Sequence, residues 1–299
     1  MSCPTDLPDR RSAGVPGVDY VAGVCCVIRT LNEAEFLGRC LDALEEQRGD
    51  IKLELVLVDS GSTDATLEIA RRRGIDPLVV RRQPLKEFDY SNALNLGIEA
   101  GGGAFVVSLA AHAIPTDRDW LLRLLSHFSD DSVVGVYSRQ LPWPDAPWHE
   151  RSRLARQFSA TGARFHKGEG GSAGRFSNAA SMIRRSTWES HPFTLPAAED
   201  RDWANRMVDL GFTIVYEAEA AVYHSHDESA RNRARRAVNL AVAEDLVLGR
   251  KRTLLLCLKQ TVGSFTFNVR GILGLRAGPL QKLGYAADAL VQAGWYLLE

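Results

Sequence analysis

The sequence predicts an α/β protein in which a mostly parallel β-sheet is flanked by helices and followed by a helical C-terminal extension. Two observations lead to this prediction. Apolar runs of strand length alternate with amphipathic segments of helix length through the first half of the 299 residues, which is typical of strand–helix–strand units. From about residue 228 to the end, the apolar residues follow a helical pattern.

The alternation begins with two strands that each lead into a helix. The run 22–28 is apolar without interruption, as expected for a strand buried on both faces. An amphipathic helix follows it, and Asn32 is placed to cap that helix. The run 53–58 is a second strand, and Ser62 or Thr63 can cap the helix after it.

The later elements are expected in the same order up to about residue 224. They are a strand at 78–80, a helix at 91–100, a strand at 105–109, a helix at 119–128, a strand at 133–137, a helix at 150–161, a strand at 179–183, a helix at 199–210 and short strands at 212–216 and 220–224. The glycine-rich segment 168–174 has the composition of an active-site lid and equally of a plain linker. We therefore expect one main domain at 20–227, between a disordered leader at 1–19 and a helical region at 228–299.

Composition and charge argue against several classes of protein. The chain has 36 Lys and Arg against 37 Asp and Glu, a net charge of -1, which is unlike a dedicated nucleic-acid binder. No apolar run approaches the roughly 18 residues of a membrane span, and the N-terminus lacks the apolar core of a secretory signal. None of the 5 cysteines forms a C-x-x-C pair. We therefore expect no disulfide framework and no cysteine zinc site, and we favour a cytoplasmic location.

Polar residues follow three of the predicted strands, where an open α/β sheet binds its ligands. They lie at 29–33, 59–62 and 110–112. Arg29 can pair with a phosphate, and Asp59 can accept hydrogen bonds from a ribose or a base. A turn and helix cap would explain the residues after Asp59 but not an acid at the strand end itself, so we interpret Asp59 as functional. The absence of G-x-G-x-x-G and G-x-x-x-x-G-K-[ST] argues against dinucleotide oxidoreductases and P-loop proteins.

The predicted helix at 199–210 carries an acid on its apolar side. Trp203, Met207 and Leu210 share one face of such a helix, and Asp200 lies on the same face because it precedes Trp203 by three positions. The helix dipole is a sufficient explanation for Glu199, since carboxylates are favoured in a first helical turn. A carboxylate on an apolar face is either paired or functional, which makes Asp200 a candidate site residue.

Histidines at two strand ends are candidates for a metal site. His224 and His226 lie two positions apart in a strand and point the same way. Two neighbouring histidines do not make a metal site, but His112 at another strand end could be a third partner. The alternative is that His112 is a satisfied core histidine, and the sequence leaves both interpretations open.

Seven short segments occur in a fixed order between residues 22 and 226. They are V-I-R-T-L-N-E at 27–33, L-V-D-S-G-S-T-D at 57–64, F-D-Y-S-N-A-L-N-L-G at 88–97, L-A-A-H-A-I-P at 109–115, F-S-N-A-A-S-M-I-R-R-S at 176–186, A-E-D-R-D-W-A-N-R at 198–206 and V-Y-H-S-H at 222–226. In this ordered set the chain resembles the family-2 glycosyltransferases of GT-A fold, in their bacterial rhamnosyltransferase-like branch. The resemblance implies a GT-A catalytic domain and an inverting transfer of a sugar from a nucleoside diphosphate to an acceptor hydroxyl. The branch suggests dTDP-rhamnose as donor, and a glycan, a lipid-linked intermediate or a natural product as acceptor.

The resemblance also implies roles for individual residues. Asp200, with Glu199 beside it, is the general base that deprotonates the acceptor hydroxyl, which is the one base that an in-line displacement needs. The residues implied to hold the nucleotide sugar are Arg29, Thr30, Glu33, Asp59, Ser91, Asn95 and Ala111. Within this group Thr30, Glu33 and Asp59 hold the base and the ribose, whereas Ser91 and Asn95 line the donor side.

The chain departs from the family at its D-x-D motif, whose second Asp usually binds the metal that bridges the diphosphate. Here the positions read Ala110, Ala111 and His112. His112 with His224 could still bind Mn²⁺ or Mg²⁺ together with diphosphate oxygens, although imidazole is a poor ligand for Mg²⁺. Alternatively, a protonated His112 and arginines in the 164–175 loop would neutralise the diphosphate without metal. We expect a divalent cation, and a chelation experiment separates the two hypotheses.

The C-terminal region combines basic charge with apolar stripes. Between residues 246 and 287 there are seven Lys or Arg and no Asp or Glu. Such helices could dock on anionic lipid at the inner face of a membrane and reach a lipid-linked acceptor. They could equally pack as a cap on the main domain or on another subunit, and the sequence predicts no oligomeric state.

Two other functions compete with glycosyl transfer. A non-catalytic nucleotide-binding scaffold would explain the lost D-x-D acids, but it has no reason to keep an inward acid at Asp200. A nucleotidyltransferase shares the α/β architecture, yet it normally needs a glycine-rich, lysine-bearing phosphate loop, and no glycine follows the first predicted strand.

Overall fold

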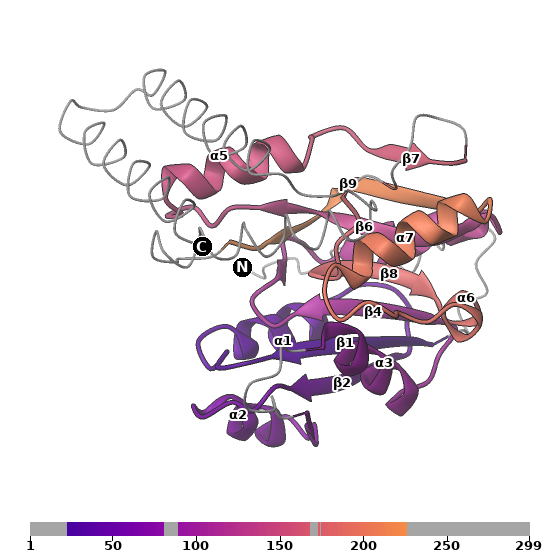
Figure 1. Cartoon of the computed structure of the whole chain (residues 1–299). Coiled ribbons are helices and arrows are strands. Elements are labelled where there is room, and N and C mark those ends of the chain that lie inside the picture. Colours follow the sequence, from indigo (N-terminus) through magenta and orange to yellow (C-terminus); the bar gives the residue numbers. More distant parts are fainter. Residues whose placement is uncertain (1–22, 81–88, 168–172, 174, 226–299) are drawn as a thin grey trace, which may run out of the picture.

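A nine-stranded sheet in the order β3-β2-β1-β4-β8-β6-β9-β5, with β7 paired to β9, runs through the described part of the chain (Figure 1). The structure, a computed structural model, describes residues 23–80, 89–167, 173 and 175–225. Six strands run in one direction, because β1, β2, β3 and β4 pair in parallel and the antiparallel β8 restores that direction in β6 and β9. The expected mostly parallel sheet with flanking helices is therefore confirmed.

The first half of the sheet is built as the sequence predicts. Its strands are β1 (Val24–Thr30), β2 (Leu53–Asp59), β3 (Leu78–Val79) and β4 (Phe105–Ala110). In β1, Cys26 and Ile28 face one apolar core whereas Cys25 and Val27 face the other. An unbroken apolar run is required because both faces of this central strand are buried.

The second half is more mixed than expected. Its strands are β5 (Ile114–Pro115), β6 (Val133–Leu141), β7 (Ala163–Phe165), β8 (Ala180–Arg184) and β9 (Thr213–Tyr223). The prediction of two short strands at 212–216 and 220–224 is wrong, because β9 is one strand that pairs with β6 along its length. A register shift between Ser138 and Arg139 of β6 absorbs the polar residues of β9 that had indicated a break.

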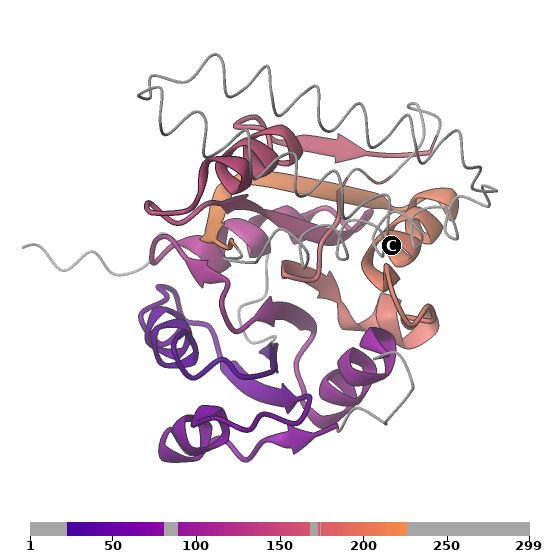
Figure 2. The same ribbon diagram turned by 60° about the vertical axis from the view of Figure 1, so that its left-hand side comes forward.

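Seven α-helices of the described chain cover the two faces of the sheet (Figures 1 and 2). One face packs under α1 (Leu37–Glu45), α2 (Thr66–Arg72) and α4 (Trp120–Ser126). The other packs under α3 (Tyr90–Ala100), α5 (Trp148–Gln157), α6 (Arg185–Ser190) and α7 (Glu199–Asp209). The two apolar layers hold the sheet rigid, so that side chains at its edge keep fixed positions.

Two expected helix caps are wrong. Asn32 does not cap α1, which starts after Phe36; its backbone is left-handed (φ 55°), and its side chain accepts a hydrogen bond from the Thr63 amide. Neither Ser62 nor Thr63 caps α2, because the Asp64 carboxylate accepts from the Thr66 amide instead (3.0 Å). The polar turns after β1 and β2 thus bond mainly to each other.

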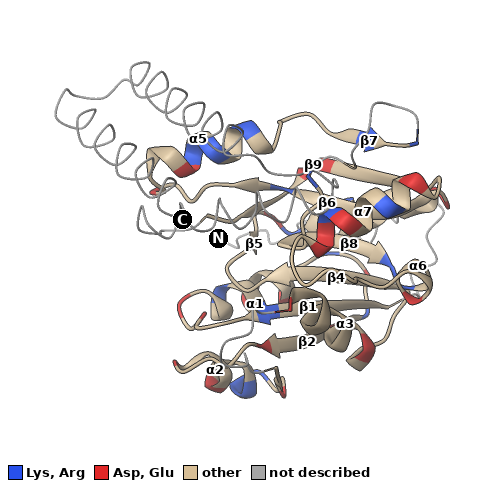
Figure 3. Cartoon of the chain, viewed as in Figure 1, with Lys and Arg blue, Asp and Glu red and all other residues tan. Residues whose placement is uncertain are grey.

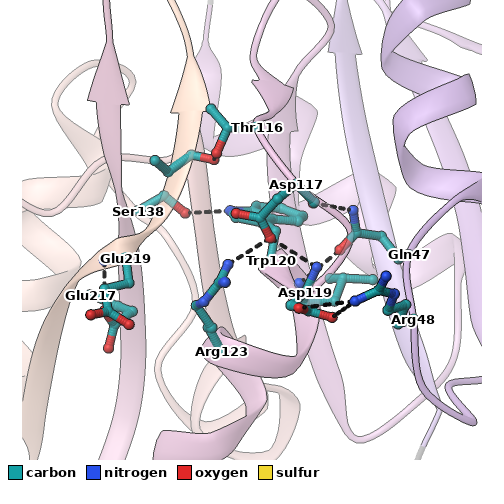
Figure 4. Close-up of polar contacts among 12 residues, drawn as sticks. Gln47, Arg48, Thr116, Asp117, Asp119, Trp120, Arg123, Ser138, Glu217 and Glu219 are labelled. Atoms are coloured by element: carbon teal, nitrogen blue, oxygen red, sulfur yellow. Dashed lines mark hydrogen bonds and ion pairs between the residues drawn. The ribbon is translucent and has the colours of Figure 1, made fainter. Parts of the chain in front are cut away.

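A polar cluster on the α4 side anchors this helix to the end of α1 (Figure 4). Gln47 donates to the Asp117 carbonyl (3.0 Å) and accepts from the Leu121 amide (2.9 Å), while Arg123 pairs with the Asp117 carboxylate at 2.6 Å. The buried indole of Trp120 donates to Ser138 of β6 at 2.9 Å. These bonds lie away from the predicted site residues and have a structural role.

Several expectations fall outside the described residues. They concern the leader at 1–19, most of the glycine-rich segment 168–174, the second histidine His226 and the helical region at 228–299. Within the residues that the structure does describe, none of the helices combines the length and apolar character needed to cross a membrane.

Candidate functional site

One edge of the sheet gathers most of the predicted site residues. The parallel strands β1, β2, β4, β6 and β9 all end there, and the antiparallel β8 begins there. The register places Arg29 beside Ala110 and Thr30 beside Asp59. Residues that follow these strands are thus neighbours in space although they lie far apart in the sequence.

The acidic pair opens α7 at this edge, in the acidic first turn that Figure 3 shows in red. The two oxygens of Asp200 accept hydrogen bonds from the backbone amides of Arg201 (2.8 Å) and Asn178 (3.2 Å). Glu199 accepts from the Asn178 side chain at 3.3 Å and lies 3.8 Å from the Arg29 guanidinium. Ala198, directly before the pair, has a left-handed backbone (φ 54°), a strained conformation for a residue other than glycine.

Burial within the acidic pair alters the chemistry of both acids. Glu199 is only 5% exposed, and this desolvation, with the nearby charge of Asp200, raises the pKa of Glu199 to about 7. Burial also raises the pKa of Asp200 above its ordinary value, while the two backbone amides and the nearby arginines oppose the shift. Both carboxylates are therefore harder to ionise than in water, and their proximity favours a state in which the pair holds one proton near neutral pH.

The structure corrects two details of the predicted α7. Leu210 is 57% exposed and does not share the buried face of Trp203 and Met207. Glu199, for which the helix dipole seemed a sufficient explanation, is buried and bonded to Asn178 and close to Arg29. Glu199 is thus buried, whereas Asp200 beside it is half-buried.

Asn178 connects four elements and was not singled out from the sequence. It is 1% exposed. Its carbonyl accepts from Arg29 (3.1 Å) and from Ser108 of β4 (2.8 Å), and its side-chain oxygen accepts from Ser181 of β8 (3.1 Å). Its amide groups bind both acids of α7, so one residue fixes the acidic pair relative to the strands.

The two predicted metal ligands meet at the same edge. The Nε2 atoms of His112 and His224 lie 3.1 Å apart, and the rings stack at 4.8 Å between centroids with 15° between their planes. The Nδ1 of His112 lies 2.7 Å from the Glu33 carboxylate, and that of His224 lies 2.8 Å from the Gln140 carbonyl oxygen. Among the described residues there is no cluster of three or more metal-ligating side chains.

Asp59 organises the turn after β2. It is 0% exposed. One of its oxygens accepts from the amides of Gly61 (2.8 Å) and Ser62 (2.7 Å). The other accepts from the hydroxyls of Thr30 (2.8 Å) and Ser62 (2.5 Å). The predicted pair of Thr30 and Asp59 therefore exists as a buried unit that fixes the turns after β1 and β2.

Ser91 and Asn95 lie on α3 and face the segment that leads to α7. Ser91 donates to the Leu195 carbonyl (2.5 Å), and Asn95 donates to the Phe193 carbonyl (2.9 Å) and accepts from the Trp188 indole (2.9 Å). Their polar groups tie α3 to this segment. Contact of either residue with a donor sugar stays a prediction.

The remaining predicted residues differ in what they can offer. Ala111 is 0% exposed, and its amide bonds to the Arg29 carbonyl (3.1 Å), so it contributes only backbone. Arg29 also lies over the Tyr90 ring, 5.6 Å from its centroid, and its buried Nε has no acceptor among the described residues. Arg164, one candidate for neutralising a diphosphate without metal, instead pairs with Asp130 at 2.5 Å.

Two residues at the site went unnoticed in the sequence. Asn178 lies at the start of β8, so its place at this edge depends on the antiparallel direction of that strand. Gln140 lies beyond residue 137, where β6 was expected to end. Alternating polar residues at Ser138 and Gln140 were the available signal for a longer strand.

The sequence matches the glycosyl transferase family 2 over residues 25–190. It is 28% identical over 229 residues to the O-antigen chain rhamnosyltransferase RfbN of Salmonella typhimurium, a match that covers 73% of this chain and 71% of that protein. It is 32% identical over 199 residues to the O-antigen chain rhamnosyltransferase WbaN of Salmonella anatum, with 63% of this chain and 62% of that protein covered.

Solved structures agree on the fold. The mannosyltransferase PcManGT of Pyrobaculum calidifontis, solved with GDP-Man and Mn²⁺, superposes with a TM-score of 0.57 at 20% identity, over 91% of this chain and 75% of that one. Glucosyl-3-phosphoglycerate synthase of Mycobacterium tuberculosis, solved with Mn²⁺, UDP-glucose and phosphoglyceric acid, gives 0.55 at 18% identity, over 78% and 81%. With a GT-A sheet, an acidic pair at its ligand-binding edge and a family match over more than half of its length, the chain belongs to glycosyl transferase family 2, in the rhamnosyltransferase-like branch.

Proposed function

We propose that this protein is an inverting glycosyltransferase that moves a sugar, with dTDP-rhamnose as the donor we favour, onto a hydroxyl of a glycan or lipid-linked acceptor in polysaccharide biosynthesis. The observation that carries the proposal is the acidic pair of α7, a buried Glu199 beside a half-buried Asp200, which lies at the sheet edge where ligands bind in open α/β folds. The names of the two Salmonella relatives support the donor and the pathway.

Asp200 is the general base in this proposal. It takes the proton of the acceptor hydroxyl as that oxygen attacks the anomeric carbon, and the nucleoside diphosphate leaves from the opposite face, which inverts the configuration. Two backbone amides hold the Asp200 carboxylate in place (2.8 and 3.2 Å), so its orientation is fixed before substrate arrives. The raised pKa of Glu199, about 7, favours a proton on that acid near neutral pH and so limits the negative charge of the pair.

We assign binding of the nucleotide to the turns after β1 and β2. Asp59 holds Gly61 and Ser62 in a fixed turn, and this turn with Thr30 would meet the base and the ribose. Arg29 has a buried Nε without a described acceptor, which leaves a donor for a phosphate or sugar oxygen. Glu33, Ser91, Asn95 and Ala111 complete the proposed donor side.

His112 and His224 fit a divalent cation. Their Nε2 atoms approach to 3.1 Å from two different strand ends, while each Nδ1 is bonded to an oxygen acceptor. When bound, such an ion would neutralise charge on the leaving diphosphate. The chain's own residues orient the two imidazoles through the bonds to their Nδ1 atoms.

The catalytic domain is proposed to span residues 20–227, with 228–299 as a helical appendage that either docks on the membrane surface or packs as a cap on the catalytic domain or on another subunit. Its seven basic residues between 246 and 287 without any acid support contact with anionic lipid. Co-sedimentation with anionic vesicles tests this part independently of catalysis.

A ligand screen followed by product analysis tests the proposed function. Thermal shifts would be measured with UDP, GDP, dTDP and CDP, each with Mn²⁺, with Mg²⁺ and with EDTA. A nucleotide at a hundred times its Kd should add about 2.7 kcal/mol of stability. Proton NMR of the product then reports the anomeric configuration. Failure of every nucleotide to shift the melting temperature would contradict the proposal, and retention of configuration would contradict the single displacement.

A further inference from the structure

The imidazole pair, His112 and His224, has a defined hydrogen-bonding pattern on its outer sides. The Nδ1 of His112 faces the Glu33 carboxylate at 2.7 Å, and the Nδ1 of His224 faces the Oε1 of Gln140 at 2.8 Å. Carboxylate and amide carbonyl oxygens only accept hydrogen bonds. Both Nδ1 atoms are therefore the protonated nitrogens of their rings, and each neutral ring carries its lone pair on Nε2.

The inner sides of the two rings then face each other. The two Nε2 atoms are 3.1 Å apart, at hydrogen-bond distance, but two lone pairs repel at this separation. A cation placed between them turns the repulsion into two favourable contacts. A metal ion does this with both rings neutral, whereas a shared proton does it without metal.

Gln140 is held in the orientation that this pattern requires. Its amide nitrogen donates to the Ser177 hydroxyl at 3.1 Å, which leaves its oxygen for His224. Gln140 is 5% exposed and His224 is 7% exposed, so these groups are bonded in the interior of the sheet edge. Glu33 reaches His112 from the turn after β1, where its own amide donates to Thr66 (2.8 Å).

We propose that Glu33 and Gln140 are positioning residues that fix the tautomers of His112 and His224, so that the site takes a divalent transition-metal ion such as Mn²⁺ or Co²⁺ in preference to Mg²⁺. This inference rests on the proposed function of the same site. Imidazole nitrogen suits transition metals, whereas Mg²⁺ prefers oxygen ligands. A carboxylate bonded to a metal-ligating histidine raises its basicity and fixes its ring. The carboxylate of Glu33, bonded to His112, thus supplies negative charge near the site in place of the acid that Ala110 replaces.

Metal titration of the full-length protein with dTDP tests the proposal. Bound Mn²⁺ would be measured by electron paramagnetic resonance, with Mg²⁺ as a competitor. We expect Mn²⁺ to bind at least about tenfold more tightly than Mg²⁺, and pulsed spectra to show coupling to imidazole nitrogen that H224A reduces. E33L and Q140L, which remove the two acceptors, should each weaken Mn²⁺ binding by about 10- to 100-fold. Q140E keeps the acceptor and should restore most of the affinity.

The chain offers a matched control. Glu217 pairs with His127 at 2.6 Å, so it is also a carboxylate on a histidine, but it lies outside the imidazole pair. E217Q should leave Mn²⁺ affinity unchanged, and melting curves of all variants report folding. Equal affinity for Mn²⁺ and Mg²⁺, or unchanged affinity in folded E33L and Q140L, would overturn the inference.

The remaining outcomes separate this inference from the function on which it rests. If dTDP or another nucleotide stabilises the protein equally in EDTA and no Mn²⁺ binds, the metal inference fails, a shared proton joins the rings, and the transferase proposal stands. If neither nucleotide nor metal binds, both proposals fail.

Discussion

The acidic pair and the imidazole pair each hold two mutually repelling groups close together, but they differ in how the two groups are brought together and in which partners they bind. Glu199 and Asp200 are neighbours in the chain, whereas His112 and His224 are 112 positions apart and meet only through the sheet. Each pair brings together two groups whose charges or lone pairs repel. The acids lie near a guanidinium and accept amide hydrogen bonds, and the imidazoles face a carboxylate and an amide oxygen.

The last residues of β1 and the turn after it supply a charged partner to each pair. Arg29 lies 3.8 Å from Glu199, and Glu33 lies 2.7 Å from His112. A turn of five residues therefore sets the electrostatics at both the proposed base and the proposed cation site. This teaches that the loss of the family's D-x-D acids need not leave the edge without negative charge, because Glu33 provides it from the turn after β1.

The largest expected effect comes from removing the proposed base of the acidic pair. D200N should lower kcat by about 10²- to 10⁴-fold, because the acceptor hydroxyl loses its base. Nucleotide binding, measured by thermal shift, should not change. D202N is the matched control, since Asp202 lies in the same helical turn but pairs with Arg206 at 2.9 Å. A D200N enzyme with near-normal kcat would assign the base to another residue.

Chelation tests the proposed cation site at the imidazole pair, and we expect it to have the next largest effect on the transfer rate. EDTA should lower the transfer rate by about 100-fold, because charge on the leaving diphosphate is no longer neutralised, and Mn²⁺ should restore it. H112A should show the same low rate with or without EDTA. Transfer that is insensitive to EDTA in the wild type would favour neutralisation by protonated histidine and arginine.

A variant of Asn178 tests whether this residue acts by positioning the acidic pair. N178A should lower kcat by about tenfold with little change in KM, because Asp200 keeps its backbone hydrogen bonds while Glu199 loses its side-chain partner. Loss of buried bonds should also cost about 1–3 kcal/mol of stability. S181A is the control, because it removes only the bond between Ser181 and the Asn178 side chain (3.1 Å). Equal kinetic effects in both variants would argue for general loosening of β8.

The smallest effect concerns stability and its pH dependence. The pKa of Glu199 is raised from an ordinary 4.5 to about 7, so the folded state binds more protons than the unfolded state in this window. Wild-type stability from this group therefore falls as pH rises from about 4.5 to 7, by roughly 3 kcal/mol. E199Q removes the effect, so its stability relative to wild type should increase between pH 5 and pH 8.

Urea unfolding at both pH values measures this difference, and E217Q provides a contrast of opposite sign. A hydrogen bond from His127 lowers the pKa of Glu217, so its stabilising contribution is present above its ordinary pKa and is lost as pH falls. E217Q should thus cost more stability at pH 8 than near pH 4. Parallel behaviour of the two variants would contradict the assigned environments.

The fold and the first half of the site were predictable because their signals are local. Mostly apolar runs predicted β2 and β4 to within one residue and β1 to within two, and the polar residues that follow these runs indicated Arg29, Asp59 and His112. The helix spacing placed Asp200 inward, which its bonds to Asn178 and Arg201 agree with. The family resemblance is confirmed by the match over residues 25–190.

By itself the sequence determined which residues occupy the ends of the strands, because apolar periodicity depends only on neighbouring positions. Only the tertiary structure decided which of those residues meet. The antiparallel direction of β8 brings Asn178 to the acids, the extension of β6 brings Gln140 to His224, and the turn after β1 brings Glu33 to His112. Strand direction and register arise from pairing between distant segments, so no local pattern in the sequence carries them.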